Sequence, residues 1–229
     1  LASFNLETRE FTKLKELPQE SFTALTYDKK NKILYITSEK GVQDYLYAYH
    51  PHKQAWVKLN PPCDIISKKL VSNSGSLYLL GRSSTKLVNL YKLTGEDECV
   101  AITDNAIVGI QTEEIVEPEI VTYPSFDGLQ IEALFYKAKP QNDKGETVLW
   151  VHGGPQDAMR KGFPAFFQYL LDNGYSVFAP NFRGSTGYGL AFTKMVERAW
   201  GAGSRLDILA GLDWLIDKGY TKKGDVFLI

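Results

Sequence analysis

Residues 147–155 read Thr-Val-Leu-Trp-Val-His-Gly-Gly-Pro, and they give the clearest indication of the architecture of the C-terminal half of the chain. Residues 147–151 form an apolar run of strand length, which is typical of a parallel strand buried on both faces. His152-Gly153-Gly154-Pro155 then predicts a turn at the carboxyl end of that strand. Because ligands of open α/β sheets bind at the carboxyl ends of the strands, we expect this turn to lie at a functional site.

The sequence around this turn alternates between helical and strand patterns. Apolar residues at helical spacing predict three helices, over residues 163–171, 192–200 and 204–216. Apolar runs predict further strands, at residues 120–123, 131–136, 175–179 and 225–229. Ser204 and Asp207 resemble a capping box at the start of the third helix. From the turn onward, the order of helices and strands predicts a parallel α/β sheet with right-handed crossovers.

The N-terminal half carries an internal repeat. Tyr35 and Tyr78 are equivalent at an offset of 43 residues, and Tyr47 and Tyr91 at an offset of 44. Each copy predicts four short strands, near 23–27, 33–38, 44–49 and 55–59 and near 69–72, 76–81, 87–92 and 98–103. A four-stranded unit with this period is typical of a β-propeller blade. Residues 3–17 fit the last two strands of an earlier blade. The alternative to a propeller is a β-sandwich in which two hairpin pairs are similar by chance.

The turn at residues 152–155 has the composition of an oxyanion-hole loop. An HGG turn ahead of a helix resembles that loop of α/β-hydrolases, where backbone N–H groups point at the charge that develops during acyl transfer. Glycine allows both the unusual backbone angles and the close approach. Gly153 and Gly154 are therefore candidate donors, with Gly154 preferred, and the motif assigns His152 to the same loop. A glycine-rich turn without a catalytic role is the alternative.

A second motif follows the strand at 175–179. Residues 180–189 read Pro-Asn-Phe-Arg-Gly-Ser-Thr-Gly-Tyr-Gly, and this spacing is not the GxGxxG of a dinucleotide site. The candidates for shaping the site are Arg183, Gly184, Ser185 and Tyr188. The alternative is a structural loop in which Arg183 makes a buried ion pair.

Taken together, these motifs resemble the prolyl oligopeptidase family of serine peptidases. The resemblance lies in Asp127-Gly128, HGGP, the motif at 181–189, Trp200-Gly201, Asp207 and Asp213-Trp214-Leu215, in that order. HGGP and RGSTGYG are typical of its acylaminoacyl-peptidase and dipeptidyl-peptidase-like branch. The resemblance implies an α/β-hydrolase domain, a propeller that restricts access to short peptides, and a triad in the chain order Ser, Asp, His.

From the internal repeat, which agrees with this resemblance, we expect residues 1–115 to be the C-terminal blades of a β-propeller, about two and a half of the four to eight that close one. Residues 116–229 are expected to form an α/β-hydrolase domain truncated before the nucleophile elbow. No G-x-S-x-G occurs, since Ser185 lies in RGSTG and Ser204 in AGSRL. We therefore expect all three triad residues beyond Ile229, and no triad-based activity from this chain alone. Asp207 and Asp213 are interpreted as capping and packing residues.

The sequence is also compatible with two rival functions: an α/β-hydrolase esterase, and a catalytically inactive propeller–hydrolase scaffold. The composition argues against a nucleic-acid partner. The chain has 26 Lys and Arg residues against 27 Asp and Glu residues, so it lacks the excess of basic residues that broad nucleic-acid binding requires. No apolar run is long enough for a membrane span. The three His and two Cys residues lack ligand spacing, so neither a metal nor a cofactor is expected. We expect a short peptide substrate and, without a signal-peptide pattern, a cytoplasmic location, and leave a homo-oligomer open.

Overall fold

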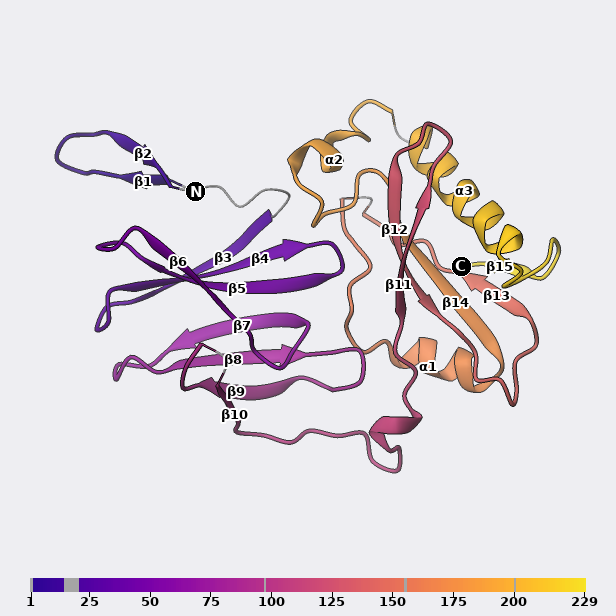
Figure 1. Ribbon diagram of the computed structural model, residues 1–229, viewed down its shortest axis with the longest axis horizontal. Coiled ribbons are helices and arrows are strands. Elements are labelled where there is room, and N and C mark those ends of the chain that lie inside the picture. Colours follow the sequence, from indigo (N-terminus) through magenta and orange to yellow (C-terminus); the bar gives the residue numbers. More distant parts are fainter. Residues whose placement is uncertain (1, 15–20, 97, 155, 200) are drawn as a thin grey trace.

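The computed structural model describes all residues except 1, 15–20, 97, 155 and 200. Figure 1 shows two four-stranded sheets, one above the other, in the N-terminal half of the chain. Beside them, the C-terminal half forms a separate sheet with helices packed against it. The change of architecture expected from the sequence is therefore visible as two different kinds of layer.

The two four-stranded sheets are antiparallel and follow the chain order. The first contains β3 (Ser21–Asp28), β4 (Ile33–Lys40), β5 (Gln43–His50) and β6 (Ala55–Leu59). The second contains β7 (Ile65–Val71), β8 (Leu77–Arg82), β9 (Asn89–Leu93) and β10 (Cys99–Ala101). Leu46 of one sheet and Leu79 of the other are fully buried in one shared apolar cluster. The eight predicted strands are confirmed as two consecutive blades packed face to face.

A short antiparallel hairpin precedes these blades. It pairs β1 (Ala2–Phe4) with β2 (Phe11–Lys13). The last two strands of an earlier blade are predicted within residues 3–17. β1 begins one residue before this range, and β2 lies inside it. Residues 15–17 of that prediction lie outside the described residues.

The C-terminal sheet has the strand order β11-β12-β14-β13-β15. Its strands are β11 (Glu119–Pro124), β12 (Gln130–Tyr136), β13 (Glu146–Leu149), β14 (Tyr175–Asn181) and β15 (Val226–Leu228). β14, β13 and β15 are parallel to one another, as predicted. β11 and β12 extend this parallel sheet as an antiparallel hairpin at one edge.

Two helices cover opposite faces of this sheet. α1 (Ala165–Asp172) places Phe167 in the same apolar cluster as Val177 of β14. α3 (Gly203–Asp217) places Leu215 in the cluster that contains Phe178. Since neighbouring residues of a strand point to opposite faces, α1 and α3 lie on opposite sides of β14.

The helix predicted over 192–200 is only partly formed. α2 (Leu190–Lys194) is five residues long, and the chain continues as turns in which Arg198 has a φ of 62°. Val196 is buried against Gly184, where an added Cβ would lie 2.4 Å from its Cγ1. The buried Val196 contact is thus made from a turn rather than from a longer helix. Trp200, the last residue of the pattern, lies outside the described residues.

Residues 102–118 connect the blades to the C-terminal sheet and contain one 3-10 turn, η1 (Thr112–Glu114). The domain boundary expected between residues 115 and 116 falls in this connection and stays a prediction. Among the described helices, none combines the length and the apolar character that crossing a bilayer requires.

Candidate active site

The loop after β13 begins with a buried histidine. The His152 ring stacks on Phe182, which follows β14, with 4.3 Å between ring centroids and 10° between planes. Its Nδ1 lies 2.9 Å from the carbonyl oxygen of Gly153, and its Nε2 lies 2.9 Å from Oγ of Ser185. Both ring nitrogens therefore have partners within the chain.

Burial sets the direction of the pKa shift of His152, and these partners determine which ring nitrogen carries the proton. Burial lowers the pKa of His152, which favours the neutral ring at pH 7. Because a carbonyl oxygen only accepts, the proton of the neutral ring belongs on Nδ1, which donates to Gly153. Nε2 is then the acceptor for the Ser185 hydroxyl, whose single hydrogen is shared with the carbonyl of Phe182 at 2.6 Å. Both ring nitrogens of His152 are thus engaged in hydrogen bonds, one within its own loop and one to Ser185 in the loop after β14.

The His152 contact also orients the next peptide group. In a trans peptide the C=O and N–H point in opposite directions, so holding the Gly153 carbonyl turns the Gly154 N–H away from the histidine. Gly154 has a φ of +115°, and an added Cβ would lie 3.0 Å from Cβ of Asp157. This position requires glycine because L side chains rarely adopt such a φ. Pro155, the last residue of the motif, lies outside the described residues.

The loop after β14 is fastened to the same region. Thr186 donates its N–H to the carbonyl of Asp157 across 3.0 Å, which joins the two loops. The Tyr188 hydroxyl donates to Glu132 and accepts from the Asn181 side chain, each at 2.8 Å. Burial raises the pKa of Tyr188, so the phenol remains protonated and able to donate. Ser185 and Tyr188 therefore hold the loop in place through their hydroxyl groups.

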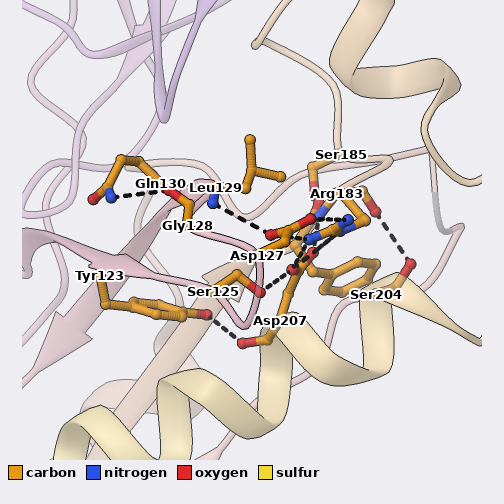
Figure 2. A network of polar contacts seen from close by, with 11 residues as sticks. Tyr123, Ser125, Asp127, Gly128, Leu129, Gln130, Arg183, Ser185, Ser204 and Asp207 are labelled. Atoms are coloured by element: carbon orange, nitrogen blue, oxygen red, sulfur yellow. Dashed lines mark hydrogen bonds and ion pairs between the residues drawn. The ribbon is translucent and has the colours of Figure 1, made fainter.

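Arg183 lies at the centre of a polar network (Figure 2). Its guanidinium donates to both carboxylate oxygens of Asp207 and, at 2.9 Å, to both oxygens of Asp127. Asp207 is fully buried in α3, whereas the Asp127 side chain is 41% exposed in the β11–β12 turn. The Arg183 side chain thus joins three segments of the C-terminal half.

Asp207 receives further hydrogen bonds besides those from the guanidinium. The Ser125 hydroxyl donates to it at 2.5 Å, and the backbone N–H of Arg183 donates to it at 2.8 Å. The capping interpretation of Ser204 and Asp207 is wrong, because the first residue of α3 follows Ala202 and has no side-chain cap. Ser204 instead donates to the carbonyl of Arg183 at 3.2 Å.

The structure therefore brings some of the sequence-predicted residues into contact and places Arg183 in a separate polar network. His152, Gly153 and Ser185 are in direct contact, while Arg183 is in an ion pair, and a role of these residues in shaping a site stays a prediction. Sequence reasoning did not assign Phe182, which supports the histidine ring, although it lies inside the quoted motif. Within the described residues, no cluster of three His, Cys, Asp or Glu side chains could hold a metal ion.

Part of the amino-acid sequence is similar to known peptidases. Residues 162–229 match the model described as the prolyl oligopeptidase family. A dipeptidyl aminopeptidase BIII of Pseudoxanthomonas mexicana is 35% identical over 82 residues, which are 36% of this chain and 12% of the relative. Among the relatives compared, the chain spans 11 to 22% of their length.

Solved structures cover nearly the whole chain. A puromycin hydrolase superposes with a TM-score of 0.88 at 20% identity, over 99% of this chain and 36% of that protein. An acylaminoacyl peptidase of Pyrococcus horikoshii superposes with a TM-score of 0.78 at 21% identity, over 92% of this chain and 33% of that protein. At such identity the likeness establishes the fold, which is propeller blades followed by the start of an α/β-hydrolase domain.

Proposed function

We propose that the intact protein is a serine peptidase, because residues 162–229 match the model of the prolyl oligopeptidase family. The proposed substrates are short peptides, cleaved in the acylaminoacyl- or dipeptidyl-peptidase manner through an acyl-enzyme. The propeller blades would limit access to peptides of small size. The triad serine, aspartate and histidine are proposed to follow Ile229 in the protein.

One observation carries this proposal. The N–H of Val151 donates to the carbonyl of Ile229 at 3.0 Å, so the end of β15 lies beside the residue that precedes His152. A nucleophile directly after β15 would therefore emerge next to the Gly153–Gly154 peptide, at the carboxyl edge where ligands bind in α/β sheets.

The proposed chemistry assigns a distinct task to each loop residue. The oxygen of the scissile carbonyl becomes negative in the tetrahedral intermediate and needs preorganised donors. The Gly154 N–H is proposed as one donor, and the backbone N–H that follows the serine as the second. His152 holds the Gly153 carbonyl at 2.9 Å and so keeps the Gly154 N–H aimed at that oxygen. Arg183 is proposed to act on the site only indirectly, by fixing the loop after β14.

Fluorophosphonate labelling of the intact protein tests this function. We expect a single covalent adduct per molecule, and peptide mapping should place it within a few residues after Ile229. Hydrolysis of N-acylated peptides, free dipeptide anilides and simple esters then distinguishes a peptidase from an esterase. An unlabelled protein, or an adduct on a serine of residues 1–229, would contradict the proposal.

Replacing Ser185 by alanine in the intact protein is expected to lower kcat about tenfold, because the buried Nε2 of His152 loses its partner and the loop loses its orientation. Steady-state hydrolysis measures this loss. The matched control is Ser176→Ala, since Ser176 is also buried but accepts the N–H of Ala138, away from both loops. Equal kcat losses in the two variants would show that the effect of Ser185 is only on packing.

A further inference from the structure

The turn between β4 and β5 of the first blade inserts into the C-terminal half. Val42 in this turn is 2% exposed and belongs to the apolar cluster under α1, together with Leu134 and Val177. A side chain of the first blade thus belongs to the apolar core between α1 and the C-terminal sheet. The relative position of blade and sheet is therefore set by buried packing as well as by polar contacts.

The same turn bonds to both loops of the candidate site through its backbone. Gly41 donates its N–H to the carbonyl of Gly187 at 2.8 Å, in the loop after β14. Lys161, in the loop after β13, donates its N–H to the carbonyl of Val42 at 2.7 Å. An added Cβ on Gly187 would lie 2.7 Å from the carbonyl oxygen of Gly41, so the approach depends on glycine.

Ion pairs reinforce this contact beside the turn. The Arg160 guanidinium lies 2.8 Å from Oε1 of Glu39 and 2.5 Å from Oδ1 of Asp44. The Asp44 side chain is only 6% exposed, and its second oxygen accepts the N–H of Ile66 in the next blade at 2.7 Å. Such partly desolvated, hydrogen-bonded pairs hold their geometry more firmly than exposed pairs do.

A short segment connects this ion pair to the proposed oxyanion donor. Between Arg160 and Gly154, the Asp157 carbonyl accepts from Thr186, and both backbone groups of Met159 bond to the side chain of Asn181. The segment is thus held by hydrogen bonds at Asp157 and at Met159, and Asp157 is the nearer of the two to Gly154 in sequence. Loss of the ion pairs of Arg160 would therefore remove one of the fixed points of the segment that leads to Gly154.

We propose that the β4–β5 turn of the propeller is a positioning element for the oxyanion loop, acting through the Asp44–Arg160 pair. This inference rests on the proposed function and assigns part of its efficiency to a blade that takes no part in the chemistry. Asp44 and Arg160 are positioning residues. Because misplacement of a catalytic group by about 1 Å can cost up to about 10²-fold in rate, loss of the pair is expected to lower kcat about tenfold.

The experiment uses Asp44→Asn, Arg160→Met and the double variant of the intact protein. Asp44→Asn removes the charge but keeps an oxygen that can accept from Ile66. Each single variant is expected to lower kcat about tenfold with KM changed by less than about twofold, since only transition-state stabilisation is lost. The double variant should be no slower than Arg160→Met, because Arg160→Met already removes the Asp44 pair as well as the Glu39 pair. Arg160→Lys, which keeps the charge, should fall between wild type and Arg160→Met.

A second readout separates positioning from stability. A peptidyl boronate, whose tetrahedral adduct occupies the oxyanion site, should bind each single variant about tenfold more weakly. The control is Ser84→Ala, which removes a 2.8 Å hydrogen bond from blade to linker at Glu117 and should leave kcat and boronate affinity unchanged.

The outcomes distinguish the two proposals. Unchanged kcat in Asp44→Asn, additive losses in the double variant, or an equal loss in Ser84→Ala would overturn the positioning role while leaving the peptidase function intact. A wild-type protein that neither labels with fluorophosphonate nor cleaves peptides would overturn the proposed function and this inference with it.

Discussion

Replacing Gly154 by proline in the intact protein is expected to lower kcat by about 10²–10³-fold, the loss found when one oxyanion donor is removed elsewhere. Proline has no N–H and holds φ near −65°, whereas Gly154 has a φ of +115°. The variant therefore loses both the proposed donor and the backbone shape that aims it. Steady-state hydrolysis of a short peptide substrate, with active sites counted by fluorophosphonate titration, measures the effect.

The neighbouring glycine offers a matched comparison. Gly153 has no left-handed φ, and a Cβ added there would meet nothing within 4 Å. Gly153→Ala also keeps its N–H, so we expect a far smaller loss of kcat than for Gly154→Pro. If both variants lose activity equally, or if Gly154→Pro retains wild-type kcat, Gly154 is not the donor.

Replacing Arg183 by methionine is expected to lower the free energy of unfolding by about 3–5 kcal/mol, the cost of leaving a buried charge without its partner. Asp207 is fully buried and would keep only the Ser125 hydroxyl and one backbone N–H as donors. Urea unfolding followed by tryptophan fluorescence measures the change, because Trp214 lies in the same helix as Asp207.

The second carboxylate of this network is the control for Arg183. Asp127 is exposed in its turn, and its bond to Arg183 lowers its pKa, so Asp127→Asn removes a pair that water already screens. We expect a much smaller loss of stability than for Arg183→Met. A loss of stability below about 1 kcal/mol in Arg183→Met would instead show that Asp207 is satisfied without the guanidinium.

Much of the fold could be predicted because its signals are local. Each strand of the two blades shows alternating apolar residues between polar turns, and the repeat places Tyr35 and Tyr78 at equivalent positions of β4 and β8. The parallel strands were predicted for the same reason, since an apolar run needs no knowledge of its neighbours. The HGG turn followed directly from its position after such a run.

The predictions that failed depend on contacts between distant residues. The spacing of apolar residues over 192–200 suits a helix, but Val196 packs on Gly184 from a turn. Asp207 three residues after Ser204 suits a cap, but its carboxylate is bonded to Arg183, 24 residues away. In both places a contact with a distant residue determined the structure in place of the local sequence preference.

For the candidate site, local patterns were enough to show which residues lie on the two loops, because glycine spacing and apolar runs can be recognised along the chain. The contacts that hold those loops in place are visible only in the folded structure. The Ser185 contact with His152 spans 33 residues, and the Asp44 contact with Arg160 spans 116, so neither partner can be read from spacing. Buried polar groups must find partners wherever the fold brings them, and that requirement is met in space rather than along the chain.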